Sequence, residues 1–167
     1  MTSVIISSFL FLTSFGTGDI RQQDAKPDTT LKQNTTTADK HLVTGWYYIT
    51  NSKNGCKRQL DNTTDYYFID PTPIVTSVNF ILLKIYKSKY SDGYGLTMQL
   101  NEKGAKAWSI ATGKAIGDKL AFIFDNKLLY TPTVNAQIEG GQTALNRGDI
   151  SKRDLKKIKK NIEGQMK

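Results

Sequence analysis

Short runs of alternating apolar and polar residues occupy the middle of this chain, and polar turns separate them. Such alternation is typical of β-strands with one buried face. It predicts strands at 46–49, 66–69, 74–86, 94–100, 120–124, 127–131 and 142–145. We expect Asp70, Pro71 and Pro73 to end the second of these strands, because proline cannot donate a hydrogen bond to a sheet.

Two segments toward the C-terminus instead place apolar residues at helical spacing. Residues 102–116 predict a helix with Asn101 as its N-cap and Gly117 at its end. A second predicted helix begins after Ser151, which is a good capping residue. The narrow apolar stripe of this last helix consists of Leu155, Ile158 and Ile162.

Two further turns complete the predicted architecture. Asp125 and Asn126 separate two apolar runs, and both residue types tolerate the positive φ angles of a tight hairpin. Gly140 and Gly141 force a turn or bulge before the last strand. Together the elements predict an α+β fold, in which an antiparallel-dominated sheet carries two helices on one face and the C-terminal half is ferredoxin-like.

The N-terminal part differs in composition from the rest. Residues 4–15 form an apolar run that ends among the small residues Ser14, Gly16 and Gly18, which predicts a signal peptide or N-terminal anchor over residues 1–18. Residues 19–42 contain almost no large apolar side chain, as in a flexible polar tether. We therefore expect a folded domain over 43–167, located outside the cytoplasm and either periplasmic or secreted.

Charge and rare residue types narrow the classes of function. Lys and Arg exceed Asp and Glu by 23 to 15, and the resulting formal net charge of +8 favours anionic partners. Cys56 and His41 are the single residues of their types, which disfavours disulfides, cysteine-based zinc sites and hydrolytic triads. The sequence contains no nucleophile-elbow, zinc-protease or phosphate-loop motif, and no aromatic RNA-binding motif. We expect no catalysis, no cofactor or metal, and no nucleic-acid partner.

Residues 95–162 carry an ordered string of motifs. The string reads GLTMQLNEKGAKAW from Gly95, IGDKLAFIFDNKLLYTPTVN from Ile116, IEGG from Ile138 and GDISKRDLKKI from Gly148. It resembles the head subdomain of the first periplasmic domain of the SecD and SecDF protein-export factors, and a weaker resemblance begins near residue 73. The positions that carry the resemblance are Leu100, Asn101, Gly104, Ala105, Lys106, Thr112, Ile116, Gly117, Leu120, Ala121, Asp125, Lys127, Pro132, Val134, Gly140 and Gly141.

Departures from the family pattern bear on both fold and function. Asn126 stands where the family has a turn glycine, and a left-handed asparagine can replace it. Thr131 and Thr133 flank Pro132 where the family usually has smaller or more apolar residues. The sequence lacks the set of transmembrane helices of a full SecDF, so we do not expect a complete translocation motor.

Two functional hypotheses remain open. By resemblance, the chain is a non-catalytic, extracytoplasmic module that contacts exported polypeptides. Alternatively, it is a basic envelope protein that docks on anionic lipid or surface polymer through its C-terminal helix. The candidate partner-binding residues are Tyr130 and Pro132 at the end of the predicted hairpin, and Lys156, Lys157 and Lys160 on the polar side of the last helix.

Overall fold

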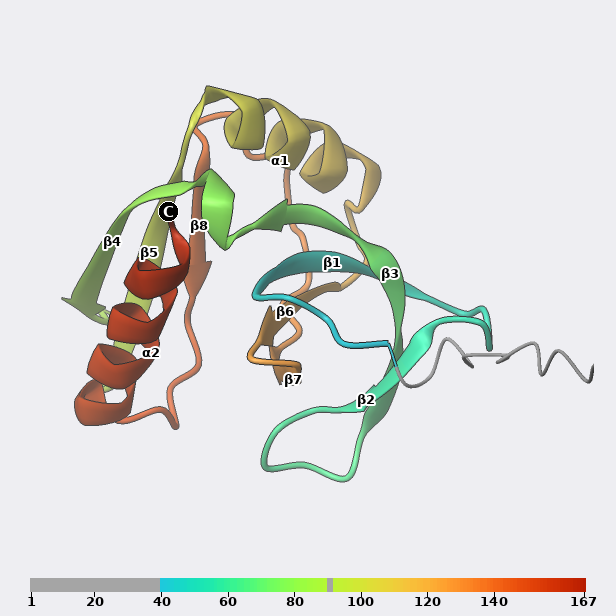
Figure 1. The fold of residues 1–167 in the computed structure, drawn as a ribbon, viewed down its shortest axis with the longest axis horizontal. Helices are drawn as coiled ribbons and strands as arrows, with labels where there is room; N and C mark the ends of the chain where they lie inside the picture. Colours follow the sequence, from blue (N-terminus) through green and yellow to red (C-terminus); the bar gives the residue numbers. More distant parts are fainter. Residues whose placement is uncertain (1–39, 90–91) are drawn as a thin grey trace, which may run out of the picture. The chain divides into compact units, whose positions relative to one another are not determined.

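The computed structural model describes residues 40–89 and 92–167 (Figure 1). The chain divides into two units, 1–33 and 34–167, and the described residues belong to the second. The predicted signal peptide or anchor, and the predicted tether as far as residue 39, lie outside the described residues. Leu42, which the sequence assigns to the tether, is buried, and its backbone N–H donates to Asn126 Oδ1 at 2.9 Å.

The described elements are mostly strands, with two α-helices and one 3-10 helix among them. In chain order they are β1 (Gly45–Thr50), β2 (Cys56–Gln59), β3 (Tyr66–Thr76), the 3-10 helix η2 (Ser77–Asn79), β4 (Phe80–Lys87), β5 (Tyr94–Leu100), α1 (Glu102–Lys114), β6 (Leu120–Phe124), β7 (Lys127–Tyr130), β8 (Gln142–Leu145) and α2 (Lys152–Gln165). The predicted α+β class with antiparallel pairing is confirmed. No helix among the described residues is long and apolar enough to cross a membrane.

The strands are divided between two antiparallel sheets, where the sequence suggested one. The larger sheet has the order β2-β3-β1-β6-β7, and the smaller has the order β4-β5-β8. The hairpin β6–β7 therefore joins β1, and α2 packs on β4 and β5 while α1 contacts β3 and β5 (Figure 1). Both helices thus contact β5, but each also covers a different second strand.

A short 3-10 turn separates the two sheets. The sequence predicts one strand over 74–86, and this prediction is wrong because η2 interrupts it. Asn79 holds the turn, since its Oδ1 accepts from the Thr76 N–H at 3.0 Å and its carbonyl accepts from the Asn101 N–H at 2.8 Å. The chain leaves the larger sheet at Thr76 and enters the smaller one at Phe80.

The predicted stop at Asp70, Pro71 and Pro73 is also wrong, because β3 runs through these residues. The pairing explains how the prolines are tolerated. Beyond Ile69, β3 no longer pairs with β2, and its register with β1 shifts between the Tyr47–Pro73 and Ile49–Ile69 pairs. Proline is accommodated where a strand has one free side or an irregular ladder.

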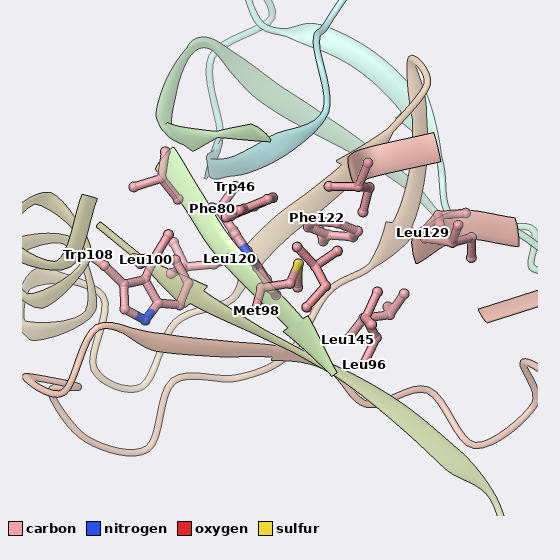
Figure 2. Close-up of a cluster of buried hydrophobic side chains, with 14 of the residues drawn as sticks. Trp46, Phe80, Leu96, Met98, Leu100, Trp108, Leu120, Phe122, Leu129 and Leu145 are labelled. Atoms are coloured by element: carbon pink, nitrogen blue, oxygen red, sulfur yellow. The ribbon is translucent and has the colours of Figure 1, made fainter. Parts of the chain in front are cut away.

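Alternation along β1 sends its side chains into two separate cores. Tyr47 lies in a small core inside the larger sheet, whose outer strands approach each other through a bridge between Leu60 and Leu128. Trp46 points the other way, into the main core between the two sheets (Figure 2). The labelled members of this main core are Trp46, Phe80, Leu96, Met98, Leu100, Trp108, Leu120, Phe122, Leu129 and Leu145.

The local signals for turns and caps are confirmed. Asp125 and Asn126 have φ angles of 48° and 62°, as the hairpin requires. Asn101 Oδ1 accepts from the Gly104 N–H at 2.8 Å and Ser151 Oγ accepts from the Asp154 N–H at 3.1 Å, so both helices have the predicted N-caps. Gly141 has a φ of 62°, and a Cβ there would lie 2.6 Å from Ala105 Cβ, so glycine is required where the chain enters β8.

Candidate functional site

A cavity of about 500 Å³ is formed by residues of both sheets, α1 and the segment after β7. Tyr130 and Pro132, two of the residues singled out from the sequence, line it. Val134 and Ala136 continue its wall along the segment that follows, and Gln142 to Ala144 of β8 form another side. The volume falls within the roughly 300–1,000 Å³ of typical ligand pockets.

Aromatic rings form part of this wall. The Trp46 ring lies 5.1 Å from Trp108 and 6.4 Å from Tyr130, measured between ring centroids. Trp46 and Trp108 are almost fully buried, and Figure 2 shows them within the main core. Because the Trp46 ring packs on Trp108, Tyr130 and Phe122, the cavity has an aromatic floor.

Hydrogen bonds from α1 fix the part of the cavity wall that lies next to this helix. Thr112 Oγ1 donates to the Trp108 carbonyl and accepts from the Ile138 N–H, both at 2.9 Å. Trp108 Nε1 donates to the Gln142 carbonyl at 3.2 Å, which ties the helix to β8. Hydrogen bonds therefore attach α1 both to the segment 132–138 and to the strand β8.

One buried donor in this wall has no acceptor. Trp46 is 1% exposed, and its Nε1 has no hydrogen-bond partner among the described residues. A buried polar group without a partner costs about 1–3 kcal/mol. An occupant of the cavity that carries an oxygen acceptor would offset part of this cost if it reached the indole N–H.

Tyr130, which lines the cavity, carries a phenol that is neutral at physiological pH. Burial, and to a lesser extent the neighbouring Tyr86, raise the pKa of its phenol above 10. No residue that lines the cavity in the described structure is Asp, Glu, Lys, Arg or His. The lining thus combines apolar surface with hydroxyl, amide and backbone groups, which suits an uncharged ligand segment.

The structure places the three candidate lysines elsewhere. Lys156, Lys157 and Lys160 are exposed on α2, and none of them lines the cavity. Lys157 Nζ lies 3.1 Å from Asp154 Oδ1, whereas no acidic partner is found for Lys156 or Lys160 among the described residues. The sequence-predicted residues therefore belong to two separate surfaces.

Sequence reasoning missed the residues that give the cavity its shape. Trp46 and Trp108 fit the apolar patterns of a strand and a helix, and such patterns do not distinguish a residue that lines a cavity from one that only packs. They are the two tryptophans of the chain, and both line the cavity. No sequence pattern singles out Ala144, which also lines the cavity, because its position on the edge strand β8 depends on the sheet order.

Comparison with known proteins bears on this fold. A structure described as a membrane component SecDF that enhances protein export matches with 21% identity and a TM-score of 0.50, over 55% of this chain and 40% of that chain. SecDF in a super-membrane-facing form matches at 20% identity and a TM-score of 0.44, over 47% of this chain and 10% of that one. SecDF from Thermus thermophilus, described as a translocon-associated membrane protein, matches at 19% identity and a TM-score of 0.42, over 52% and 12%.

The first of these matches shows the fold alone, and the chain spans between a tenth and two-fifths of the length of the SecDF chains that it matches. No curated protein sequence matches the chain. The family model described as "SecDF, P1 head subdomain" matches residues 51–161, which extends the resemblance well upstream of Gly95. Because this match covers well over half of the sequence, the chain belongs to the SecDF P1 head subdomain family.

Proposed function

We propose that this chain is a non-catalytic module of protein export that binds exported polypeptides in the cavity lined by Tyr130 and Pro132. The observation that carries the proposal is the cavity itself, which combines an aromatic floor, an uncharged lining and a sheet edge. Aromatic side chains offer large contact area at low entropic cost. Such a lining suits apolar side chains of many different sequences.

Family membership supports the link to export. The matched SecDF proteins are described as enhancing protein export and as associated with the translocon. Because the chain spans only part of those proteins, the proposal covers contact with the polypeptide and leaves out the rest of their activity. The predicted signal or anchor over residues 1–18 supports an extracytoplasmic location.

Photo-crosslinking in the native host tests the proposal. A photoreactive residue in place of Tyr130 is expected to capture a range of exported proteins, identified by mass spectrometry of the adducts. A probe in place of Arg153, which is 82% exposed on α2, serves as the matched surface control. One dominant partner at Tyr130, or the same proteins at both probes, would contradict binding of exported polypeptides in the cavity.

The α2 surface supports a second candidate function. Lys156 and Lys160 project from a helix whose apolar stripe is buried, so their charges face solvent. We propose as the alternative that this surface docks on anionic lipid or a surface polymer. Flotation with vesicles that contain anionic lipid tests it. Binding that disappears at moderate salt, and with the double change Lys156→Gln and Lys160→Gln, supports this alternative, and equal binding to neutral vesicles contradicts it.

A further inference from the structure

The strand β8 forms one edge of the smaller sheet. It pairs with β5 alone, and the sheet order β4-β5-β8 leaves its other side without a strand partner among the described residues. Gln142, Thr143 and Ala144 of this strand line the cavity. The free edge therefore lies beside the space in which the proposed function locates the polypeptide.

The pairing register shows which backbone groups face that edge. Opposite residues in an antiparallel ladder alternate between pairs that exchange hydrogen bonds and pairs that do not. The Leu100 N–H donates to the Gly141 carbonyl at 2.8 Å, so this pair is hydrogen-bonded. Two residues further along each strand, Met98 and Thr143 form the next hydrogen-bonded pair. Gln142 lies between Gly141 and Thr143, so its pair with Gln99 is not hydrogen-bonded. Its N–H and carbonyl therefore point away from β5.

The same alternation turns the backbone of Ala144 outward, since it lies opposite Thr97. A contact from α1 agrees with this assignment, because the Gln142 carbonyl is reached by Trp108 Nε1 from outside the sheet. That bond occupies the Gln142 carbonyl. The outward N–H and carbonyl of Ala144 have no such partner among the described residues, and Ala144 is only half-buried.

The cavity next to this edge also suits the side chains of an added strand. Neighbouring strands lie about 4.8 Å apart, and alternate side chains point to the same face. A strand beside β8 would direct one apolar side chain toward Trp108 and Tyr130. It would also place carbonyl oxygens in the cavity that Trp46 helps to line. The formal net charge of +8 favours occupants with neutral or acidic flanks.

We propose that an extended polypeptide adds to the free edge of β8 as a fourth strand of the smaller sheet, with its backbone paired to Ala144 and an apolar side chain in the cavity. The proposal rests on the proposed function and specifies how the polypeptide is held. In strand addition, main-chain hydrogen bonds supply affinity for any sequence and the pocket selects side chains. This mode suits a module that receives many different exported chains.

Peptides with blocked amides separate strand addition from other modes of peptide binding. The probe is a short fluorescent peptide of alternating valine and serine with acidic ends, and its affinity for the full chain is measured by anisotropy. N-methylation of the alternate amides that face β8 is expected to weaken binding about tenfold or more, while methylation of the other set changes it less than about twofold. Equal effects of the two sets would overturn strand addition while leaving polypeptide binding intact. Absence of binding by every peptide would overturn the proposed function as well.

A pair of variants tests the edge itself. Ala144→Pro removes only an N–H that faces the free edge, which an edge strand tolerates, so the protein is expected to keep its melting temperature within a few degrees. Its affinity for the unmethylated peptide is expected to fall about tenfold, and to fall further than that of Ala144→Ser, which keeps the N–H. A folded Ala144→Pro variant that binds the peptide as tightly as the unchanged chain would refute pairing at Ala144.

Discussion

Arg147 Nη1 lies 3.0 Å from Asp61 Oδ2 and joins two segments that are 86 residues apart in the sequence. The same guanidinium donates to the Asp61 carbonyl at 2.8 Å and to the Leu129 carbonyl at 2.9 Å. Its Nε lies 2.7 Å from Asp149 Oδ1. The Arg147 side chain, 12% exposed, thus fastens the connection between β8 and α2 to the larger sheet.

Removing this guanidinium is expected to cost stability. Arg147→Ala leaves the Leu129 carbonyl and the Asp61 groups without their donor, so the free energy of unfolding should fall by about 2–4 kcal/mol. Denaturant unfolding followed by tryptophan fluorescence measures this. Arg153→Ala is the matched control, because Arg153 is 82% exposed and should change stability by less than about 0.5 kcal/mol. Equal effects of the two substitutions would contradict the role of Arg147.

Because the Tyr47 phenol is buried, we expect the free energy of unfolding to fall at alkaline pH. Burial, followed by nearby Cys56, raises the pKa of its phenol from 10.0 to about 12, and the hydroxyl donates to the Val43 carbonyl at 2.8 Å. Because the folded pKa lies above the unfolded one, the stabilisation is complete below pH 10 and is lost as the pH rises toward 12. At about 1.4 kcal/mol for each pKa unit, the loss should reach roughly 2–3 kcal/mol.

Tyr47→Phe isolates this contribution from the other titrating groups. At neutral pH the variant should be less stable by about 1 kcal/mol, because the Val43 carbonyl loses its donor. Between pH 10 and 12 the unchanged chain should lose more stability than the variant, so the difference between them narrows or reverses. Parallel dependence of the two unfolding free energies on pH would contradict the raised pKa of Tyr47.

Asn126 is expected to stabilise the fold through its side chain as well as its backbone. Its Oδ1 accepts from the Leu42 N–H at 2.9 Å and from Arg58 Nη2 at 2.6 Å, while its φ of 62° suits glycine equally well. Asn126→Gly should therefore lower the unfolding free energy by about 1 kcal/mol through the lost hydrogen bonds. Asn126→Ala should cost about 1 kcal/mol more, because of its positive φ. Thermal unfolding of both variants checks this order, and an Asn126→Gly variant as stable as the unchanged chain would exclude the side-chain contribution.

Signals within a few residues of one another predicted much of the fold. The caps at Asn101 and Ser151 and the turn at Asp125 and Asn126 depend on local backbone geometry, and the structure has them where the sequence places them. The division into two sheets depends on pairing between distant segments, and Asn79 sets it through bonds to Thr76 and Asn101. The periodicity of apolar residues along the sequence does not specify which strands pair with one another.

The residues that line the cavity could be predicted only in part, because the fold brings many of them together from distant segments. Tyr130 and Pro132 lie within the motif string that carries the family resemblance, and the structure places both in the cavity wall. Trp46 and Trp108 come from a strand and a helix that are brought together only by the tertiary fold, where their rings lie 5.1 Å apart. The edge position of Ala144 depends on the sheet order, which the sequence pattern alone does not specify.

The central claim is that polypeptides bind in the cavity beside β8. Titration of the isotope-labelled chain with the unlabelled valine–serine peptide, followed by nuclear magnetic resonance, tests it most directly. We predict that the largest shifts fall on the backbone amides of Gln142 and Ala144 and on the indole N–H of Trp46, with little change at Lys156 and Lys160. Shifts concentrated on the α2 lysines, or no shifts along β8 at saturating peptide, would contradict the account.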